Sequence, residues 1–124
     1  MRVLGLGFRA SAPPGSLRAA AEAAASGRLD RIDRLATAAD LAGHPAMRAL
    51  AEELGLPVVG APLDRIAAET RAATSPRIPA RYGGRSIAEA SALIVAGRGG
   101  RLIAPRAISP DGTAVAALAE GEGP

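Results

Sequence analysis

The stretch Val3-Leu4-Gly5-Leu6-Gly7-Phe8-Arg9-Ala10-Ser11 decides how the chain begins its fold. With Arg2 before it, the first part of this stretch forms a mostly apolar segment over residues 2–8, which has the length and composition of a buried strand. Gly5 and Gly7 have no Cβ atom, so a ligand could approach their peptide N–H groups closely. Arg9 follows at the carboxyl end of the strand, the edge at which open α/β sheets bind ligands, and its guanidinium suits a carboxylate or a phosphate. The stretch therefore predicts an anion-binding edge on a buried strand.

Strand and helix patterns alternate along the rest of the chain. Helices are predicted over residues 17–25, 45–55, 62–70 and 86–97, and further strands over residues 31–38, 56–59, 101–108 and 113–118. Ser11 is the predicted N-cap of the first helix, and Ser86 with Glu89 has the form of a capping box. Asp111-Gly112 predicts a tight turn, so the last two strands should be antiparallel.

These elements predict an α/β fold, a three-layer α/β/α domain with a mixed sheet of about five strands and an antiparallel C-terminal hairpin. The length of 124 residues fits one domain, which we expect over residues 1–119, with residues 120–124 as a disordered tail. Residues 74–84 hold two prolines, two glycines and two arginines. We interpret them as a mobile loop that a ligand orders, with a static surface connection as the alternative.

Composition excludes several classes of function. The chain has no cysteine and one histidine, which excludes disulfides, thiolate catalysis and the usual zinc clusters, so we expect no metal and no cofactor. No run of about 18 apolar residues occurs, and we expect a cytoplasmic protein without a membrane partner. All 15 basic residues are arginines spread along the chain, and aromatic residues are 2%. This pattern argues against nucleic acid, whereas the net charge of +3 fits an acidic small molecule or a composition bias of the genome.

The candidate catalytic residues are His44 and Glu89. His44 is either an exposed loop residue or a general acid or base, because its ordinary pKa lies near neutrality. Glu89 could fill the same role, although helix capping alone accounts for it. The segment Gly5–Ala10 fits a relaxed dinucleotide fingerprint, with Asp30 or Asp33 about twenty residues on. The alternative is a tight strand-to-helix turn.

An ordered set of segments covers nearly the whole chain and resembles a known family. The segments are Gly5-Leu-Gly-Phe-Arg9 with Ser11, Leu35-Ala-Thr37, Pro45-Ala-Met47, Leu50 to Pro57, Ser86-Ile-Ala-Glu-Ala90, Arg101 to Arg106, Ser109 and 113–117. Together they are similar to the cobalamin-biosynthesis family of CobE and the C-terminal domain of CbiG. Leu41 and His44 depart from the Lys and Glu that the family often has there. Phe8 replaces a Cys common in CbiG members, which favours a stand-alone, CobE-like chain.

The resemblance implies a protein of corrin-ring construction that binds a polycarboxylate tetrapyrrole, a precorrin, with other enzymes of that pathway as further partners. In CbiG proteins it implies opening of a cobalt-precorrin δ-lactone with loss of acetaldehyde, so a lactone hydrolase, or an accessory to one, is the alternative. A nucleotide-binding module is a second alternative, and whether the chain is an enzyme stays open. The candidates for substrate binding are Gly5, Gly7, Arg9, Ser11, Thr37, Arg81, Ser86 and Arg106.

Overall fold

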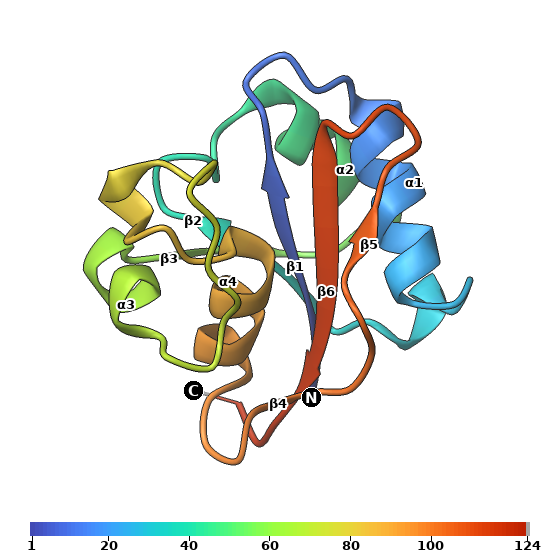
Figure 1. Cartoon of the computed structure of the whole chain (residues 1–124). Helices are drawn as coiled ribbons and strands as arrows, with labels where there is room; N and C mark the ends of the chain where they lie inside the picture. Colours follow the sequence, from blue (N-terminus) through green and yellow to red (C-terminus); the bar gives the residue numbers. More distant parts are fainter. Residues whose placement is uncertain (124) are drawn as a thin grey trace.

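A six-stranded sheet between two layers of helices organises residues 1–123, the part of the chain that this computed structural model describes (Figure 1). The strands are β1 (Arg2–Phe8), β2 (Arg34–Ala38), β3 (Val58–Ala61), β4 (Arg101–Leu102), β5 (Ala107–Ile108) and β6 (Ala114–Glu120). The α-helices are α1 (Pro14–Ala24), α2 (Pro45–Leu54), α3 (Leu63–Ala68) and α4 (Ile87–Ala96), and the short 3₁₀ helices are η1 (Leu29–Arg31) and η2 (Ala80–Tyr82). The predicted α/β fold is confirmed.

β1 lies at the centre of the sheet, whose strand order is β3-β2-β1-β6-β4, with β5 also paired to β6. β1, β2 and β3 are parallel, so Leu4 lies opposite Leu35 of β2. β6 runs antiparallel to β1 and brings Leu118 opposite the same Leu4. The sheet is therefore mixed, as predicted, and its central strand is the apolar stretch with which the chain begins.

The predicted strand over residues 101–108 is divided in two, which is why the sheet has six strands rather than about five. β4 ends at Leu102, although the Ile103 N–H still donates to the Leu118 carbonyl at 3.0 Å. Pairing with β6 resumes only at Ala107. Pro105 stands in the gap, and a proline has no N–H with which to continue a ladder.

The C-terminal hairpin of β5 and β6 is antiparallel, as predicted. The Gly112 N–H donates to the Ser109 carbonyl at 2.9 Å, and Gly112 has a φ of +76°, which a glycine adopts without strain. The Asp111 carboxylate accepts hydrogen bonds from the hydroxyls of Ser16, Ser109 and Thr113 and from the Thr113 N–H. These bonds, with that from Ser16 the strongest, hold the pKa of Asp111 well below its ordinary value of 3.8.

Asp111→Asn is expected to lower the melting temperature at pH 7, because the amide loses the charge that these donors stabilise. The pKa of Asp111 is lower in the folded protein, so the unfolded chain binds more protons as the pH falls. The contribution of the carboxylate is therefore complete above about pH 5 and is lost as the pH falls below 3.8. Thermal unfolding of both proteins between about pH 7 and pH 2 measures this. A difference in melting temperature that stayed constant would contradict a role for the charge.

The two faces of the sheet pack against different helices, as Figure 1 shows, with α1 and α2 on one side and α4 and α3 on the other. Leu4 and Leu6 point into the core beneath α1 and α2, whereas Val3 joins the cluster beneath α4. Gly5 also faces α4, and a Cβ atom there would lie 2.0 Å from the Ala88 carbonyl oxygen. The glycine therefore allows α4 to lie directly on the central strand.

Some predicted boundaries differ from the observed ones. Ser11 is not the N-cap of α1, because the helix begins after Pro13, which makes no side-chain cap. β2 begins only at Arg34, since Arg31 is the last residue of η1 and residues 32 and 33 belong to neither element. Of the predicted tail, Glu120 is the last residue of β6, the Gly121 N–H donates to the Met1 carbonyl at 3.0 Å, and Pro124 lies outside the described residues. The domain limits of 1–119 and a disordered 120–124 stay predictions.

Candidate functional site

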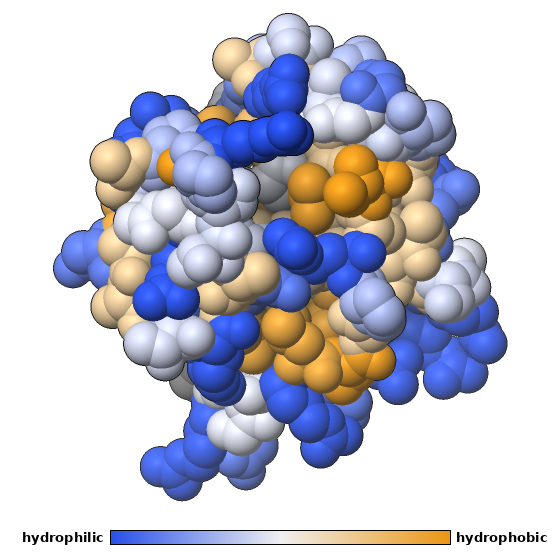
Figure 2. All heavy atoms as spheres, in the orientation of Figure 1, coloured by the Kyte–Doolittle hydropathy of each residue, from blue (hydrophilic) through white to orange (hydrophobic). Residues whose placement is uncertain are grey.

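A cleft of about 230 Å³ opens at the carboxyl end of β1, on the face of the sheet that carries α4. Aliphatic side chains from three elements form part of its wall: Ile78 from the loop before η2, Ile87 from α4 and Val115 from β6. Gly7 and the hairpin residues Gly112 and Thr113 complete this edge. Figure 2 shows hydrophobic side chains on this side of the molecule, over β5 and β6, beside a band of hydrophilic ones.

Arginines from three separate segments line the cleft. Arg9 follows β1, Arg77 lies in the loop 74–84, and Arg106 lies between β4 and β5. Within residues 1–123, neither Arg9 nor Arg77 forms an ion pair, and Arg106 has its Nε 3.7 Å from Oε2 of Glu89. A planar guanidinium donates two parallel hydrogen bonds to a carboxylate, so this cluster suits a ligand with several carboxylates.

The N-terminal turn of α4 forms another wall of the cleft through Ser86, Ile87 and Ala88. The Ser86 hydroxyl accepts the Glu89 N–H at 3.2 Å, which confirms the predicted cap. Glu89 does not complete a capping box, because its Oε1 accepts the Ala73 N–H at 2.7 Å instead. The first N–H groups of a helix carry a partial positive charge, so this wall adds to the attraction for anions.

Contacts of η2 and Gly83, in the second half of the loop 74–84, anchor the loop to the rest of the protein. Tyr82 in η2 is 2% exposed, its hydroxyl donates to the Asp40 carboxylate at 2.8 Å, and burial raises the pKa of that hydroxyl. Arg81 donates to the same carboxylate at 3.2 Å and stacks over the Tyr82 ring at 4.7 Å. Gly83 packs against Ala67 of α3. These contacts leave the residues before η2, including Arg77, to face the cleft.

Tyr82→Phe is expected to loosen this loop without emptying the core, because the ring stays and only the hydroxyl bond to Asp40 is lost. A hydrogen bond to a charged group contributes about 1.5–3 kcal/mol, which predicts roughly ten- to 150-fold faster trypsin cleavage after Arg77. Asp40→Ala removes the acceptor of both Tyr82 and Arg81, so it should speed cleavage at least as much. Equal cleavage of wild type and Tyr82→Phe would contradict anchoring by this bond.

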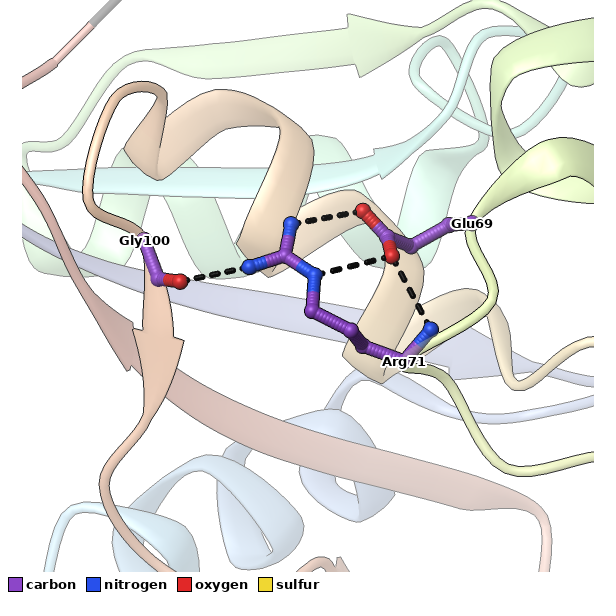
Figure 3. A network of polar contacts seen from close by, with 3 residues as sticks. All are labelled: Glu69, Arg71 and Gly100. Carbon is purple, nitrogen blue, oxygen red and sulfur yellow. Dashed lines mark hydrogen bonds and ion pairs between the residues drawn. The ribbon is translucent and has the colours of Figure 1, made fainter.

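A network of Glu69, Arg71 and Gly100 fixes the chain just before the loop (Figure 3). The Arg71 guanidinium binds the Glu69 carboxylate through Nε at 3.0 Å and a terminal nitrogen at 2.7 Å, and its other terminal nitrogen donates to the Gly100 carbonyl at 2.6 Å. The hydrogen bonds from Arg71 lower the pKa of Glu69, and they raise the pKa of Arg71 in turn. This network ties the segment after α3 to the turn after α4.

His44 has a structural role in which both ring nitrogens are engaged. Nδ1 accepts the Ala46 N–H at 3.1 Å and caps α2, and Nε2 lies 2.9 Å from the Ala10 carbonyl oxygen. This pattern assigns the proton to Nε2, because an accepting Nδ1 is unprotonated. The ring also packs edge-on against Phe8 at 5.1 Å. His44 does not line the cleft.

The structure brings part of the predicted site together. Gly7, Arg9, Ser86 and Arg106 all line the cleft. Gly5 packs under α4, Thr37 is buried with its hydroxyl donating to the Leu6 carbonyl at 2.7 Å, and Ser11 is exposed on a turn away from the cleft. Arg81, which pairs with Asp40, also lies outside the cleft lining.

The glycine motif does not form a phosphate-binding loop, because Gly5 and Gly7 lie inside β1 and their register partners on β6 are Ala117 and Val115. The sequence argument for a nucleotide thereby loses its support. Within residues 1–123, no group of three or more His, Asp or Glu side chains could hold a metal ion. In the same part of the chain, the helices are too short or too polar to cross a membrane.

Known proteins resemble this chain over nearly its full length. Residues 2–119 match the family model described as cobalamin synthesis G C-terminus. CobE, a protein from the cobalamin (vitamin B12) biosynthetic pathway, shares 27% identity and a TM-score of 0.83, over 96% of this chain and 89% of that one. The cobalamin biosynthesis protein chiG from Agrobacterium tumefaciens shares 32% identity and a TM-score of 0.73, over 98% of this chain and 99% of that one.

A more distant structure shares the fold alone. A cobalamin biosynthesis protein G homologue from Sulfolobus solfataricus is 19% identical with a TM-score of 0.73, and the match covers 98% of this chain but 37% of that one. No curated protein matches the chain. The family model covers residues 2–119, which include those of the cleft, and the chiG match covers 98% of the chain. The chain therefore belongs to the cobalamin synthesis G C-terminus family and is a protein of cobalamin biosynthesis.

Proposed function

We propose that this protein binds a polycarboxylate tetrapyrrole, a precorrin-type intermediate of corrin-ring construction, in the cleft at the end of β1. The observation that carries the proposal is the convergence of Arg9, Arg77 and Arg106 from three segments on one partly apolar cleft. A precorrin carries acetate and propionate arms around an apolar ring system, so its chemistry is complementary to these walls. We expect this binding to involve no cofactor. The expected partners, besides the tetrapyrrole, are other corrin-pathway enzymes in the cytoplasm.

An absorbance titration with hydrogenobyrinic acid, a metal-free corrin with carboxylate arms, tests the proposal. Wild-type protein is expected to give a saturable spectral change. The combined variant Arg9→Ala, Arg77→Ala and Arg106→Ala should remain folded by circular dichroism and lose the change. Arg48→Ala is the matched control, because Arg48 is exposed on α2 and outside the cleft. Absence of saturable binding by wild type at millimolar ligand would contradict the proposal.

A lactone hydrolase is the second candidate, and one specific contact favours it. Glu89 is 13% exposed at its side chain and lies 3.7 Å from Arg106, so a carboxylate stands next to the cationic cleft and could direct a water. His44 does not support this candidate as a base, since both of its ring nitrogens are engaged. Incubation with a cobalt-precorrin δ-lactone distinguishes the two. Acetaldehyde release that scales with protein and is lost in Glu89→Gln would favour the hydrolase over binding alone.

A further inference from the structure

The size of the cleft limits how much of a tetrapyrrole can enter it. Its volume is about 230 Å³. Pockets that enclose most of a drug-sized ligand have roughly 300–1,000 Å³, and a tetrapyrrole macrocycle is larger than such a ligand. A macrocycle bound at this site therefore leaves most of its atoms outside the cleft.

The lining suits a single ring with acidic arms. The aliphatic side chains of Ile78, Ile87 and Val115 offer contact to the face of one five-membered ring. The guanidinium groups of Arg9 and Arg106 approach from different segments, so two carboxylates on neighbouring ring carbons would each meet a cation. The cleft thus offers an apolar surface to one ring and one arginine to each of its two carboxylate arms.

The surface beside the cleft can carry the part that stays outside. Ile108 of β5 lies directly opposite Val115 of β6, and cross-strand partners point to the same face of a sheet. Val115 lines the cleft, so the Ile108 side chain lies on the same face, next to the opening. Ile108 is 65% exposed, the one large hydrophobic side chain exposed to this degree within residues 1–123, and Figure 2 shows hydrophobic side chains over this part of the sheet.

We propose, resting on the function proposed above, that the protein holds its tetrapyrrole by one edge. One pyrrole-type ring with its acetate and propionate arms occupies the cleft, and the adjoining part of the macrocycle lies outside against Ile108. The rest of the ligand remains open to solvent, where another protein can reach it.

Two probes of different size test this proposal. Opsopyrrole dicarboxylic acid is a single pyrrole ring with one acetate and one propionate arm, and it is expected to displace hydrogenobyrinic acid competitively in the absorbance titration. Arg106→Ala should weaken both ligands at least fivefold. Ile108→Ser should weaken hydrogenobyrinic acid at least threefold and leave the monopyrrole unchanged, because the small probe does not reach beyond the cleft.

The outcomes separate this proposal from the function on which it rests. Saturable binding of hydrogenobyrinic acid without displacement by the monopyrrole at millimolar concentration would overturn the one-ring site and leave tetrapyrrole binding standing. Unchanged affinity for both ligands in a folded Ile108→Ser protein would overturn the placement of the macrocycle against β5. Failure of wild type to bind either ligand would overturn tetrapyrrole binding itself. Arg48→Ala serves again as the control that should change neither affinity.

Discussion

Gly5→Ala is expected to destabilise the protein by about 3 kcal/mol, a large part of the folding free energy of a domain of this size. The new Cβ atom would lie 2.0 Å from the Ala88 carbonyl oxygen and 2.9 Å from the Ala92 Cβ atom. Both contacts are with α4, and the oxygen is a backbone atom of the helix. The helix would have to move off the central strand, which opens the buried cluster of Val3, Ala92 and Leu93.

Alanine substitutions at two further glycines, where a Cβ atom is less crowded, serve as comparisons for Gly5→Ala. Gly15→Ala is the matched control, because a Cβ atom at this position in α1 meets nothing within 4 Å, and alanine is the better helix former. It should be neutral or stabilise by about 0.5 kcal/mol. Gly7→Ala should fall between the two, since its nearest contact is the Ile87 Cβ atom at 3.1 Å. Urea unfolding followed by circular dichroism measures all three, and a Gly5→Ala protein as stable as wild type would contradict close packing of α4 on β1.

The two glycines of the first strand also show where sequence reasoning reached its limit. The apolar run of residues 2–8 predicted β1 correctly, because burial on both faces of a central strand leaves a continuous apolar pattern. The same pattern does not say what approaches a glycine. A ligand and a helix both require the missing Cβ atom, and only the register of α4 over β1 shows that the helix lies over Gly5.

Sequence reasoning placed those residues of the candidate site whose position follows from the end of a strand or the start of a helix. Arg9 follows a strand and Ser86 begins a helix, so their places at the sheet edge followed from the elements themselves. For the loop arginines the prediction selected Arg81, whereas Arg77 lines the cleft. The choice depends on Tyr82, which is buried through contacts with Asp40 from a distant part of the chain. The one signal in the sequence was that Tyr82 is the single tyrosine of the chain, next to Arg81.

The apolar wall of the cleft was missed for a related reason. Ile87 and Val115 fall within a predicted helix and a predicted strand, and nothing in the local pattern marks them as residues of a cleft. They line the cleft because α4 begins beside the end of β1 and leaves both side chains uncovered there. Where a helix begins relative to a strand that is far away in sequence is a tertiary property, so no local pattern could indicate it.

Arg9→Ala is expected to leave the fold intact and to weaken the affinity for hydrogenobyrinic acid by about 1–3 kcal/mol, roughly five- to 150-fold. The side chain is exposed at the end of β1, lines the cleft, and forms no ion pair with residues 1–123, so its removal costs no internal contact of that kind. The backbone contribution stays, because the Arg9 N–H donates to the Thr113 carbonyl at 2.9 Å whatever the side chain. Melting temperature and affinity should therefore separate in this variant.

The charge and the geometry of Arg9 can be distinguished by Arg9→Lys. Lysine keeps the positive charge but cannot form two parallel bonds to one carboxylate, so it should restore only part of the affinity. Arg106→Ala provides the contrast, since Arg106 already has Glu89 at 3.7 Å and part of its attraction is met inside the protein. Arg9→Ala should therefore lower the affinity for hydrogenobyrinic acid more than Arg106→Ala does. Unchanged affinity in a folded Arg9→Ala protein would place the ligand away from the end of β1, because Arg9 lines the cleft there and forms no ion pair within residues 1–123.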